Sequence, residues 1–491
     1  MYKSTRGSAE AVTASKAILK GIAEDGGLYV PDYIPTIDFN IDELAKLDYK
    51  ALAYLVMSKF FTYFTEAELK ACIDKAYDSK FTTEEITPVK KIGDTYFLEL
   101  YYGPTLAFKD VALSILPHLL KTSVKKQGID KNILILTATS GDTGKAALEG
   151  FTNVDGTKII VFYPVEGVSI VQKLQMVTHN GNNTHVVAIK GNFDDAQTAV
   201  KNVFTDDSMQ KSLDEKDYVF SSANSINIGR LIPQVVYYFY SYISLYKKGD
   251  ISKDEKINVV VPTGNFGNIL AGYLAKNMGL PIDKLICASN ENKVLYDFIT
   301  TGTYDRNREF FITNSPSMDI IVSSNLERLL YFVSGKDSAK ISELMKTLKT
   351  NGKYEITEAM KKQLCDFYGG YASEKETTDE IKALYDNYKE IIDTHTAVAA
   401  SVYNKYKAET KDSTKTIVLS TASPYKFPKA VMNAIDEKYS SLDEFELIKE
   451  MDKLSDYKIP ASINGIEHKE VVHTKVCEKA EISKVVLDYI K

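Results

Sequence analysis

Cysteine is scarce in this chain, and its few positions show no pattern. Cys72, Cys287, Cys365 and Cys477 are scattered, with no Cys-x-x-Cys pair and no spacing typical of metal ligands. Such thiols are typical of a reducing compartment. The histidines form no pattern with carboxylates or thiols either, so we expect no metal in the site.

Long apolar runs are also missing. The most apolar stretch, 231–246, carries Gln234, Ser241 and several tyrosines and is about 16 residues long, whereas a helix that spans a bilayer needs about 20 apolar residues. Residues 1–9 are polar and lack the apolar core of a signal peptide. We therefore expect a cytoplasmic protein without a membrane segment.

Positive charge is in short supply as well. The chain has 60 basic and 66 acidic residues, and its net charge of −6 gives no basic field for holding a nucleic acid. Five of the basic residues are arginines: Arg6, Arg230, Arg306, Arg308 and Arg328. In a chain that prefers lysine, an arginine indicates a position where lysine would not serve.

The rest of the composition is that of a globular protein, with 44% hydrophobic and 26% charged residues. Residues 1–85 have a mostly helical pattern, and from residue 86 short β-branched runs alternate with helical segments. The expected strands are Tyr96–Leu100, Asn132–Thr137, Lys158–Tyr163, His185–Ile189, Tyr218–Ser221, Ile257–Val261, Leu285–Ala288 and Thr416–Ser420. Continuous apolar runs of this kind are typical of parallel strands that are buried on both faces.

This alternation predicts an α/β fold: two open, mostly parallel sheets with flanking helices, and a small helical N-terminal domain. At 491 residues the chain is too long for one domain, which usually has roughly 100–200 residues. We place the domains at 1–85, 86–245 and 246–491. Because ligands of open α/β sheets bind outside the carboxyl ends of the strands, we expect the site in the loops that follow them.

Two glycine loops lie at such strand ends. They are Thr139-Ser140-Gly141-Asp142-Thr143-Gly144 and Thr263-Gly264-Asn265-Phe266-Gly267-Asn268, and each precedes an expected helix. A loop of this kind presents free N–H groups and the positive end of a helix dipole to an anion. The spacing of a P-loop is absent. Each loop alone could be an ordinary turn with a helix cap, such as Asp142, Thr143 or Asn268; the pair favours an anion site.

A third segment contains a lysine in apolar surroundings. Gly103-Pro104-Thr105-Leu106-Ala107-Phe108-Lys109-Asp110 should begin a helix near Leu106 that runs to about Leu120, with a kink at Pro117. Lys109 would share a helix face with apolar residues, which lowers the pKa of its amine and makes it nucleophilic, as a Schiff base requires. The alternative is a lysine that extends past its apolar neighbours into solvent.

The fourth segment, Ser221–Arg230, has short hydroxyl and amide side chains and ends in an arginine. The guanidinium group suits a phosphate because it can donate two parallel hydrogen bonds. A loop with a helix cap and a surface arginine is the alternative.

In this order the four segments resemble the threonine synthase family, and the resemblance covers nearly the whole chain. It includes Ser4-Thr5-Arg6-Gly7, Asp25-Gly26-Gly27-Leu28-Tyr29-Val30-Pro31, Gly191-Asn192-Phe193-Asp194-Asp195 and Asp393-Thr394-His395-Thr396-Ala397. The segments around Lys109 and Asn224–Arg230 are specific to this family. The two glycine loops are shared with its relatives, the β-family or fold type II of pyridoxal-phosphate enzymes.

The resemblance implies that pyridoxal 5'-phosphate is bound and gives each segment a role. Lys109 is similar to the lysine that carries the cofactor, and Thr421 to the hydroxyl residue that faces its pyridine nitrogen. The remaining implied residues are Gly264, Asn265, Phe266, Gly267 and Asn268 for the cofactor phosphate, Asp142 for the cofactor, Ser140, Gly141 and Thr143 for the substrate carboxylate, and Asn224, Ser225, Asn227 and Arg230 for the substrate phosphate.

One segment departs from the family pattern. Where relatives commonly carry His-Pro-Ala-Lys, this chain has Ser423-Pro424-Tyr425-Lys426, so no imidazole is expected from this position. The resemblance still implies a lyase, either a monomer or a homodimer, that converts O-phospho-L-homoserine and water to L-threonine and phosphate. Two alternatives are a phospholyase that gives 2-oxobutyrate, ammonia and phosphate, and a binding protein that has lost catalysis.

Overall fold

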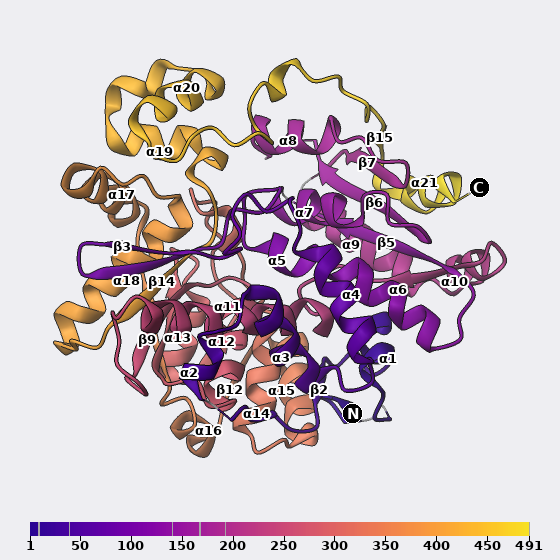
Figure 1. Ribbon diagram of the computed structural model, residues 1–491. Coiled ribbons are helices and arrows are strands. Elements are labelled where there is room, and N and C mark those ends of the chain that lie inside the picture. The colour runs from indigo at the N-terminus through magenta and orange to yellow at the C-terminus, as the bar shows by residue number, and fades with distance from the viewer. Residues whose placement is uncertain (8–9, 39, 140, 166–167, 192, 491) are drawn as a thin grey trace.

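The structure is a computed structural model that describes the chain apart from residues 8–9, 39, 140, 166–167, 192 and 491. Two open sheets form its centre, and helices pack around both (Figure 1). This arrangement confirms the α/β fold with mostly parallel sheets that the sequence predicts.

The larger sheet has six strands in the order β13-β10-β9-β14-β4-β3. All neighbours are parallel except the edge pair β3 and β4, which is antiparallel. The strands are β3 (Val89–Ile92), β4 (Thr95–Glu99), β9 (Ile257–Pro262), β10 (Ile282–Ser289), β13 (Phe367–Tyr371) and β14 (Thr416–Ser420). Because β4, β14 and β9 are parallel neighbours, the loops that follow them meet at one edge of the sheet.

The smaller sheet has the order β15-β7-β6-β5-β8, and all its neighbouring strands are parallel. Its strands are β5 (Asn132–Ala138), β6 (Thr157–Pro164), β7 (Thr184–Ile189), β8 (Tyr218–Ser221) and β15 (Val476–Cys477). The eight strands expected from the sequence are all present in the two sheets, with ends shifted by up to three residues.

The sheets exchange segments along the chain. Strands β3 and β4 lie in the expected first lobe, 86–245, but pair within the larger sheet, and β15 from the expected second lobe joins the smaller one. The limits at residues 85 and 245 stay a prediction.

The N-terminal region combines helices with a small antiparallel pair. Its elements are β1 (Tyr2–Ser4), α1 (Ala14–Lys20), β2 (Tyr29–Pro31), α2 (Ile41–Leu44), α3 (Tyr49–Phe60) and α4 (Glu66–Ala76). Helix α4 begins with a capping box in which the Thr65 hydroxyl accepts from Glu68 N and the Glu68 carboxylate accepts from Thr65 N. Two such contacts stabilise a helix start that faces solvent.

Further helices cover both sheets. Those of the first half are α5 (Lys109–Leu113), α6 (Leu116–Lys126), α7 (Asp142–Phe151), α8 (Ile170–Val177), α9 (Phe193–Thr205), α10 (Asp207–Asp214) and α11 (Ile228–Lys247). Those of the second half are α12 (Gly267–Asn277), α13 (Val294–Thr301), the 3-10 helix η1 (Pro316–Met318), α14 (Leu326–Val333), α15 (Ser338–Asn351), α16 (Glu358–Lys362), α17 (Glu374–Tyr388) and α18 (Thr394–Thr410). The antiparallel pair of β11 (Thr303–Asp305) and β12 (Lys353–Glu355) lies among them.

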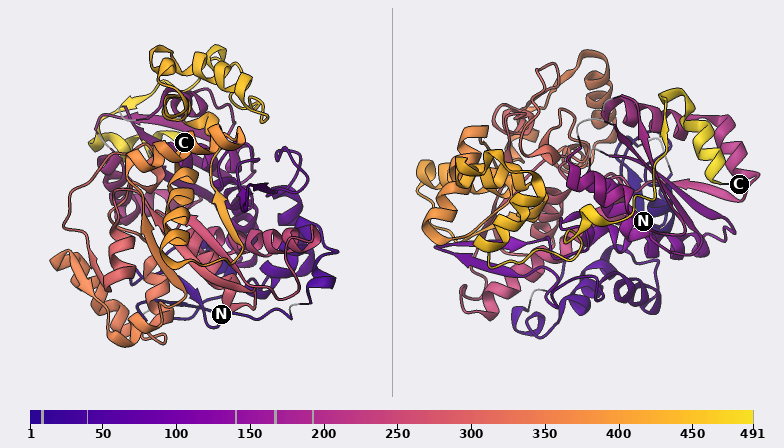
Figure 2. Two further views of the ribbon diagram at one scale, coloured as in Figure 1. Left: turned by 90° about the vertical axis from the view of Figure 1, so that its left-hand side faces the viewer. Right: turned by 90° about the horizontal axis from the view of Figure 1, so that it is seen from above.

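The C-terminal part crosses back over the molecule. After η2 (Pro424–Lys426), α19 (Pro428–Ile435), η3 (Glu437–Ser441) and α20 (Glu444–Leu454), the chain passes through η4 (Ile466–His468) to β15, η5 (Lys479–Glu481) and α21 (Ile482–Tyr489). The yellow segment in Figure 2 shows this return to the smaller sheet, where α21 packs against α9.

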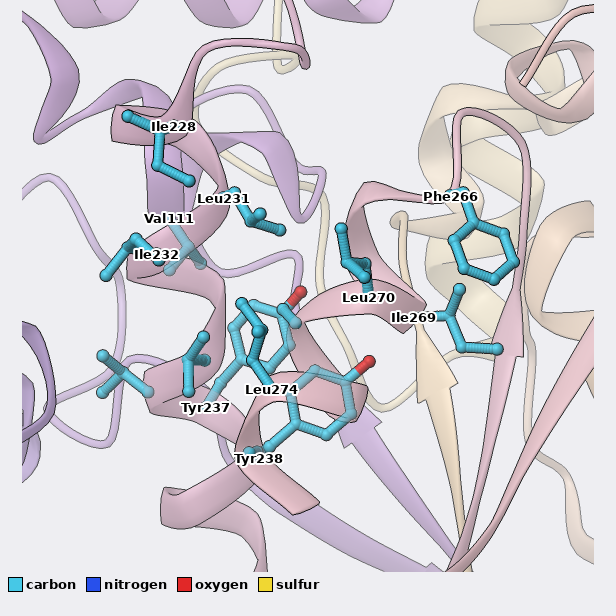
Figure 3. Packing of buried hydrophobic residues seen from close by; sticks show 14 of the residues in the cluster. Val111, Ile228, Leu231, Ile232, Tyr237, Tyr238, Phe266, Ile269, Leu270 and Leu274 are labelled. Atoms are coloured by element: carbon cyan, nitrogen blue, oxygen red, sulfur yellow. The ribbon is translucent and has the colours of Figure 1, made fainter. Parts of the chain in front are cut away.

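The apolar stretch in the middle of the sequence forms the buried helix α11. It packs against α12, α3 and α5, and Leu231, Ile232, Tyr237 and Tyr238 are buried in that packing (Figure 3). Burying a side chain such as leucine contributes about 1.5–3 kcal/mol. No helix among the described residues is long and apolar enough to cross a membrane.

The single helix expected from Leu106 to about Leu120 is wrong. The chain forms two helices, α5 and α6, separated at Ser114 and Ile115, and Leu106 itself has a left-handed backbone with φ 62°. Pro117 lies in the first turn of α6, where its missing N–H would have no partner in any case. The proline therefore starts a helix rather than kinking one.

Candidate active site

Lys109 is brought beside β14 by backbone pairing. Ala107 and Ala422 form an isolated antiparallel bridge, and Phe108 N donates to Thr421 O at 2.9 Å. Helix α5 begins at Lys109. Lys109 is 8% exposed and Thr421 is 5% exposed, so both are buried. Two segments about 300 residues apart in the chain, each following a strand of the larger sheet, thus place a lysine next to a hydroxyl residue.

The Lys109 amine is held by an acid and a hydroxyl. Nζ donates to Asp142 Oδ2 at 3.2 Å and to Ser317 Oγ at 3.1 Å. Burial lowers the pKa of Lys109 from its ordinary value, and the charge of Asp142 opposes this effect. A lowered pKa favours the neutral, nucleophilic form of the amine, which is the property that the sequence predicts for Lys109.

Asp142 is the hub of a buried network. Its Oδ1 accepts from Gln172 Nε2 at 2.9 Å and lies 2.8 Å from Lys426 Nζ, while Oδ2 faces Lys109. Burial would raise the pKa of Asp142, but Lys109 and then Lys426 hold it well below its ordinary value. The carboxylate therefore stays ionised between two lysines.

The first glycine loop follows β5 and opens α7 at Asp142. The Thr139 hydroxyl accepts from Gly141 N at 3.0 Å and from Gly144 N at 2.9 Å. Gly141 has φ 150°, and a Cβ there would lie 2.7 Å from the Gln172 side chain, so only glycine fits. No side chain of the described chain caps α7 at Gly141, and Thr143 is half-buried at its start. The predicted Ser140 lies outside the described residues.

The second glycine loop follows β9 and opens α12. The carbonyl of Gly264 accepts from Ser323 Oγ at 2.7 Å, and that of Asn265 accepts from Asn325 N at 3.1 Å. Phe266 has a left-handed backbone with φ 63°, and within the described residues no side chain caps the start of α12 at Gly267. Its first N–H groups have no partner in the helix and face the loop, which suits a phosphate.

Asn268 does not cap this helix. Its Oδ1 accepts from Tyr237 at 2.7 Å and from Tyr238 at 2.8 Å, so the side chain points into the packing between α11 and α12. Figure 3 shows the two tyrosine rings of α11 beside α12. Asn268 Nδ2 is buried and has no hydrogen-bond partner among the described residues, so it remains a donor for a phosphate at this loop, beside the backbone N–H of Asn268.

The segment after β8 places Arg230 in the same region. Arg230 Nη1 donates to Ala223 O at 2.8 Å, but Nε is buried and has no hydrogen-bond partner among the described residues. Burial lowers the pKa of Arg230 to about 10, and its charge lowers the pKa of Lys109 as well. A buried guanidinium with an unpaired donor and no neighbouring carboxylate contact is expected where an anion binds.

The neighbours of Arg230 divide into two groups. Asn224 is exposed and Ser225 half-buried; within the described part of the chain, their side chains hydrogen-bond only to each other and to Ile226 N. Asn227 is fully buried: its Nδ2 donates to Ile18 O and Ser222 O, both at 2.9 Å, and its Oδ1 accepts from Gly229 N. The Asn227 side chain is thus committed to capping α11 and anchoring α1.

Three residues of the site were not predicted from the sequence. Ser317 contacts Lys109; Lys426 contacts Asp142; and His395 Nε2 accepts from Ser317 N at 3.1 Å. His395 lies in a segment that carries the family resemblance and Lys426 in the segment that departs from the family pattern, and neither was given a role. Only three-dimensional contacts between distant loops show their place.

Comparisons with known proteins give the class first. A sequence model described as "Pyridoxal-phosphate dependent enzyme" matches residues 83–422, so the chain belongs to the pyridoxal-phosphate-dependent enzymes of this fold. Models described as "Threonine synthase N terminus" and "Threonine synthase, C-terminal" match residues 1–77 and 396–485. Within that class the chain belongs to the threonine synthase family.

Individual relatives agree with this family. The chain is 37% identical to threonine synthase of Saccharomyces cerevisiae, over 99% of both chains, and 38% identical to that of Pseudomonas aeruginosa, over 88% of this chain and 90% of the relative. The crystal structure of PLP-bound threonine synthase from Brucella melitensis has a TM-score of 0.87 and 35% identity and covers 100% of this chain and 98% of that one.

The described residues fit pyridoxal phosphate. A buried amine at Lys109 can bond to an aldehyde, and the uncapped start of α12 can bind a phosphate. A Cβ at Gly264 would lie 2.6 Å from Ser317 O, so the loop is closed tightly at this point and glycine is required. The unpaired Arg230 Nε then leaves a second anion position for a substrate.

Proposed function

We propose that this enzyme converts O-phospho-L-homoserine and water to L-threonine and phosphate. The observation that carries the proposal is the buried, unpaired donor of Arg230 near a buried Lys109 and a separate, uncapped helix start at α12. Such a site offers two anion positions, one for the cofactor phosphate and one for a substrate phosphate.

The proposed roles are those that the family resemblance implies for these residues. Lys109 carries the cofactor, Gly264 to Asn268 bind its phosphate through N–H groups, Thr421 faces its ring nitrogen and Asp142 lies beside it. The loop from Ser140 to Thr143 takes the substrate carboxylate, and Asn224, Ser225 and Arg230 take the substrate phosphate, with Asn227 holding their loop in place.

The reaction needs repeated proton transfer at one point. The leaving phosphate is on Cγ, so loss of the Cα proton alone cannot expel it, and a Cβ proton must also be removed. Bound pyridoxal phosphate supplies the electron sink that makes these protons acidic. The Lys109 amine can take the protons from Cα and Cβ and return one at Cγ and, in the last step, one at Cα. Water adds its oxygen at Cβ and gives its spare proton to the departing phosphate. The C–O bond at Cγ breaks, and a C–O bond at Cβ forms.

The test is to incubate cofactor-loaded protein with O-phosphohomoserine and to follow the organic product by NMR together with released phosphate. We expect threonine and phosphate in equal amounts. Release of 2-oxobutyrate with phosphate would identify a phospholyase with the same site, and no release of phosphate would contradict the substrate assignment.

Lys109→Ala should abolish turnover. It should also abolish the covalent link between cofactor and protein that borohydride reduction makes permanent, because the amine that forms this link is gone. Lys121→Ala is the matched control, since Lys121 pairs with the exposed Asp155 on the surface. Turnover by the Lys109 variant without an added amine would exclude its role. The cytoplasmic location and the monomeric or homodimeric state stay predictions from the sequence.

A further inference from the structure

The short helix η1 (Pro316–Met318) lies over the Lys109 amine, and its middle residue takes part in the site. Ser317 Oγ accepts from Lys109 Nζ at 3.1 Å and donates to Asp142 Oδ2 at 3.3 Å, while Lys109 Nζ also donates to Asp142 Oδ2 at 3.2 Å. Amine, hydroxyl and carboxylate thus form a closed triangle of hydrogen bonds.

Ser317 is held in this position from one side by an imidazole. His395 Nε2 accepts from Ser317 N at 3.1 Å, and His395 Nδ1 lies 2.9 Å from Asp393 Oδ1. Because Nε2 accepts, the ring proton is on Nδ1 and is donated to Asp393. His395 and Asp393 are 3% and 0% exposed, and the Thr396 hydroxyl also donates to Asp393. A buried, fully paired His–Asp unit therefore fixes the backbone of η1.

A second network holds η1 from the other side. Asp319 Oδ1 accepts from Asn290 Nδ2 at 2.8 Å, from Asn292 Nδ2 at 3.1 Å and from Thr313 Oγ1 at 2.7 Å, and Oδ2 accepts from Thr313 N at 2.9 Å. Asn290 directly follows β10, so the segment that carries Ser317 is tied to the end of a sheet strand. Pairing on both sides preorganises the Ser317 hydroxyl instead of leaving it on a free loop.

We propose that Ser317 is a further residue of the active site, which orients the Lys109 amine and stabilises its protonated form, and that His395 is the positioning residue for Ser317. This inference rests on the proposed role of Lys109. The amine must hold a proton between one transfer and the next, and the Ser317 Oγ and Asp142 Oδ2 atoms accept from it in that state. The hydroxyl also directs the nitrogen toward one side of the site.

The charges around Lys109 make the pKa of its amine sensitive to the contact with Ser317. The groups that face Lys109 are Asp142 from α7, Lys426 from η2 and Arg230 from α11; burial and both cations lower the pKa of the amine, and Asp142 raises it. The uncharged ring of His395 from α18 contacts this network through Ser317 N. With two cations nearby, removing an acceptor of the ammonium should lower the pKa of Lys109 further.

The first test uses cofactor-free protein, so that it does not depend on activity. The rate at which acetic anhydride labels Lys109 is measured against pH by mass spectrometry. In Ser317→Ala we expect the midpoint of this titration to fall by about half to one pH unit. Ser317→Thr, which keeps the hydroxyl, should remain within about 0.3 unit of the parent. An unchanged midpoint in Ser317→Ala would overturn the inference.

The positioning role of His395 is tested by a matched pair of variants. His395→Leu removes the acceptor for Ser317 N and should lower the labelling midpoint of Lys109 as Ser317→Ala does. His395→Gln can still accept the hydrogen bond from Ser317 N, so its midpoint should lie close to that of the parent. Equal midpoints in the two variants would show that His395 does not act through Ser317.

Kinetics of the loaded enzyme provide a second readout. Ser317→Ala should lower kcat by about tenfold with little change in KM, because the hydroxyl contacts the amine and not the substrate phosphate. A rise in KM alone would contradict the assignment. The proposed function fails separately, if borohydride does not trap the cofactor on Lys109 in the parent protein.

Discussion

The five arginines differ in what their guanidinium groups contact. Arg6 makes a bidentate pair with Glu327, and Arg308 pairs with Asp297. Arg306 donates to Lys349 O and is half-buried. Arg328 is fully buried and donates to the carbonyls of Tyr29 and Ile226. Each of these groups is satisfied within the protein, so their role is structural. Arg230 alone among them combines burial with a donor that lacks a partner in the described chain.

Arg230 therefore gives a test at the scale of one residue. In Arg230→Gln we expect the KM for O-phosphohomoserine to rise by about ten- to a hundredfold, since a charge-assisted hydrogen bond to a phosphate is lost. Inhibition by inorganic phosphate, the proposed product, should weaken by a similar factor. Arg230→Lys keeps the charge without the planar donor pair, so its KM should lie between those of the parent and of Arg230→Gln. Steady-state kinetics that left both constants unchanged would place the phosphate pocket elsewhere.

Local sequence was informative about residues whose chemistry depends on their own neighbours. Lys109 and Arg230 were found because an apolar helix start and a rare arginine are local signals. Ser317 and Lys426 were missed because their roles arise from contacts with Lys109 and Asp142, which are 175 to 284 positions away along the chain. A lone serine after a proline has no pattern that marks it as a partner of a lysine.

At the scale of the element, the start of α11 shows two roles within one motif. Asn227 closes the N-terminus of α11 through Gly229 N and joins it to α1 through Ile18 O, whereas Asn224, three residues earlier, is exposed. The same residue type thus supports the loop at one position and faces solvent at the other. The sequence resemblance gave both asparagines to the substrate.

A pair of alanine variants separates these roles. Asn227→Ala should lower the free energy of unfolding by about 2 kcal/mol, because a buried cap and two further hydrogen bonds are lost. Asn224→Ala should leave stability within about 0.5 kcal/mol and raise the KM for the phosphorylated substrate instead. Urea denaturation of both variants decides the matter. If Asn227→Ala unfolded at the parent's midpoint, its contacts would contribute nothing net.

Helices and strands were predictable where the pattern of apolar residues was clear. The buried parallel strands were found because their apolar runs are continuous, and β13 was missed because Gly369 and Gly370 interrupt its pattern. The sequence predicts one helix around Lys109 where the structure has two, because the left-handed Leu106 and the break at Ser114 and Ile115 have no clear sequence signal. In both cases tertiary packing decided the element.

At the scale of the molecule, the C-terminal return ties the last residues to the smaller sheet. Val472 N donates to Val177 O, and His473 Nε2 donates to His179 O, both at 2.9 Å; β15 pairs with β7, and Lys158 Nζ donates to Tyr489 O. These contacts bring the C-terminal segment against the end of α8 and against strands β7 and β6. They also bury a histidine within a set of polar partners.

That histidine is uncharged in the folded protein. His179 Nδ1 lies 2.9 Å from Lys145 Nζ and accepts from it, and Nε2 donates to Thr152 Oγ1 at 2.6 Å, since that hydroxyl donates to Leu148 O. Burial, and then the charge of Lys145, lower the pKa of His179 to about 4, while Glu149 opposes them. The unfolded chain would take up the proton near the ordinary value of about 6.5.

The stability of the protein should therefore depend on pH in a defined window. Because the folded pKa is the lower one, the contribution of His179 is fully present above about pH 6.5 and is lost as the pH falls toward 4. The loss amounts to about 3 kcal/mol for His179. His118 and His185, whose pKa values burial also lowers to about 4, act in the same direction.

Urea denaturation between pH 7.5 and 4.5, at a fixed cofactor concentration, measures this effect. In His179→Gln the free energy of unfolding should decline less steeply as the pH falls. A part of the decline should remain, because His118 and His185 still contribute to it. His468→Gln is the matched control, because the His468 side chain is 83% exposed and packs against little of the folded protein. A decline as steep in His179→Gln as in the control would mean that His179 is already protonated in the folded protein, and that Lys145 is not its hydrogen-bond donor.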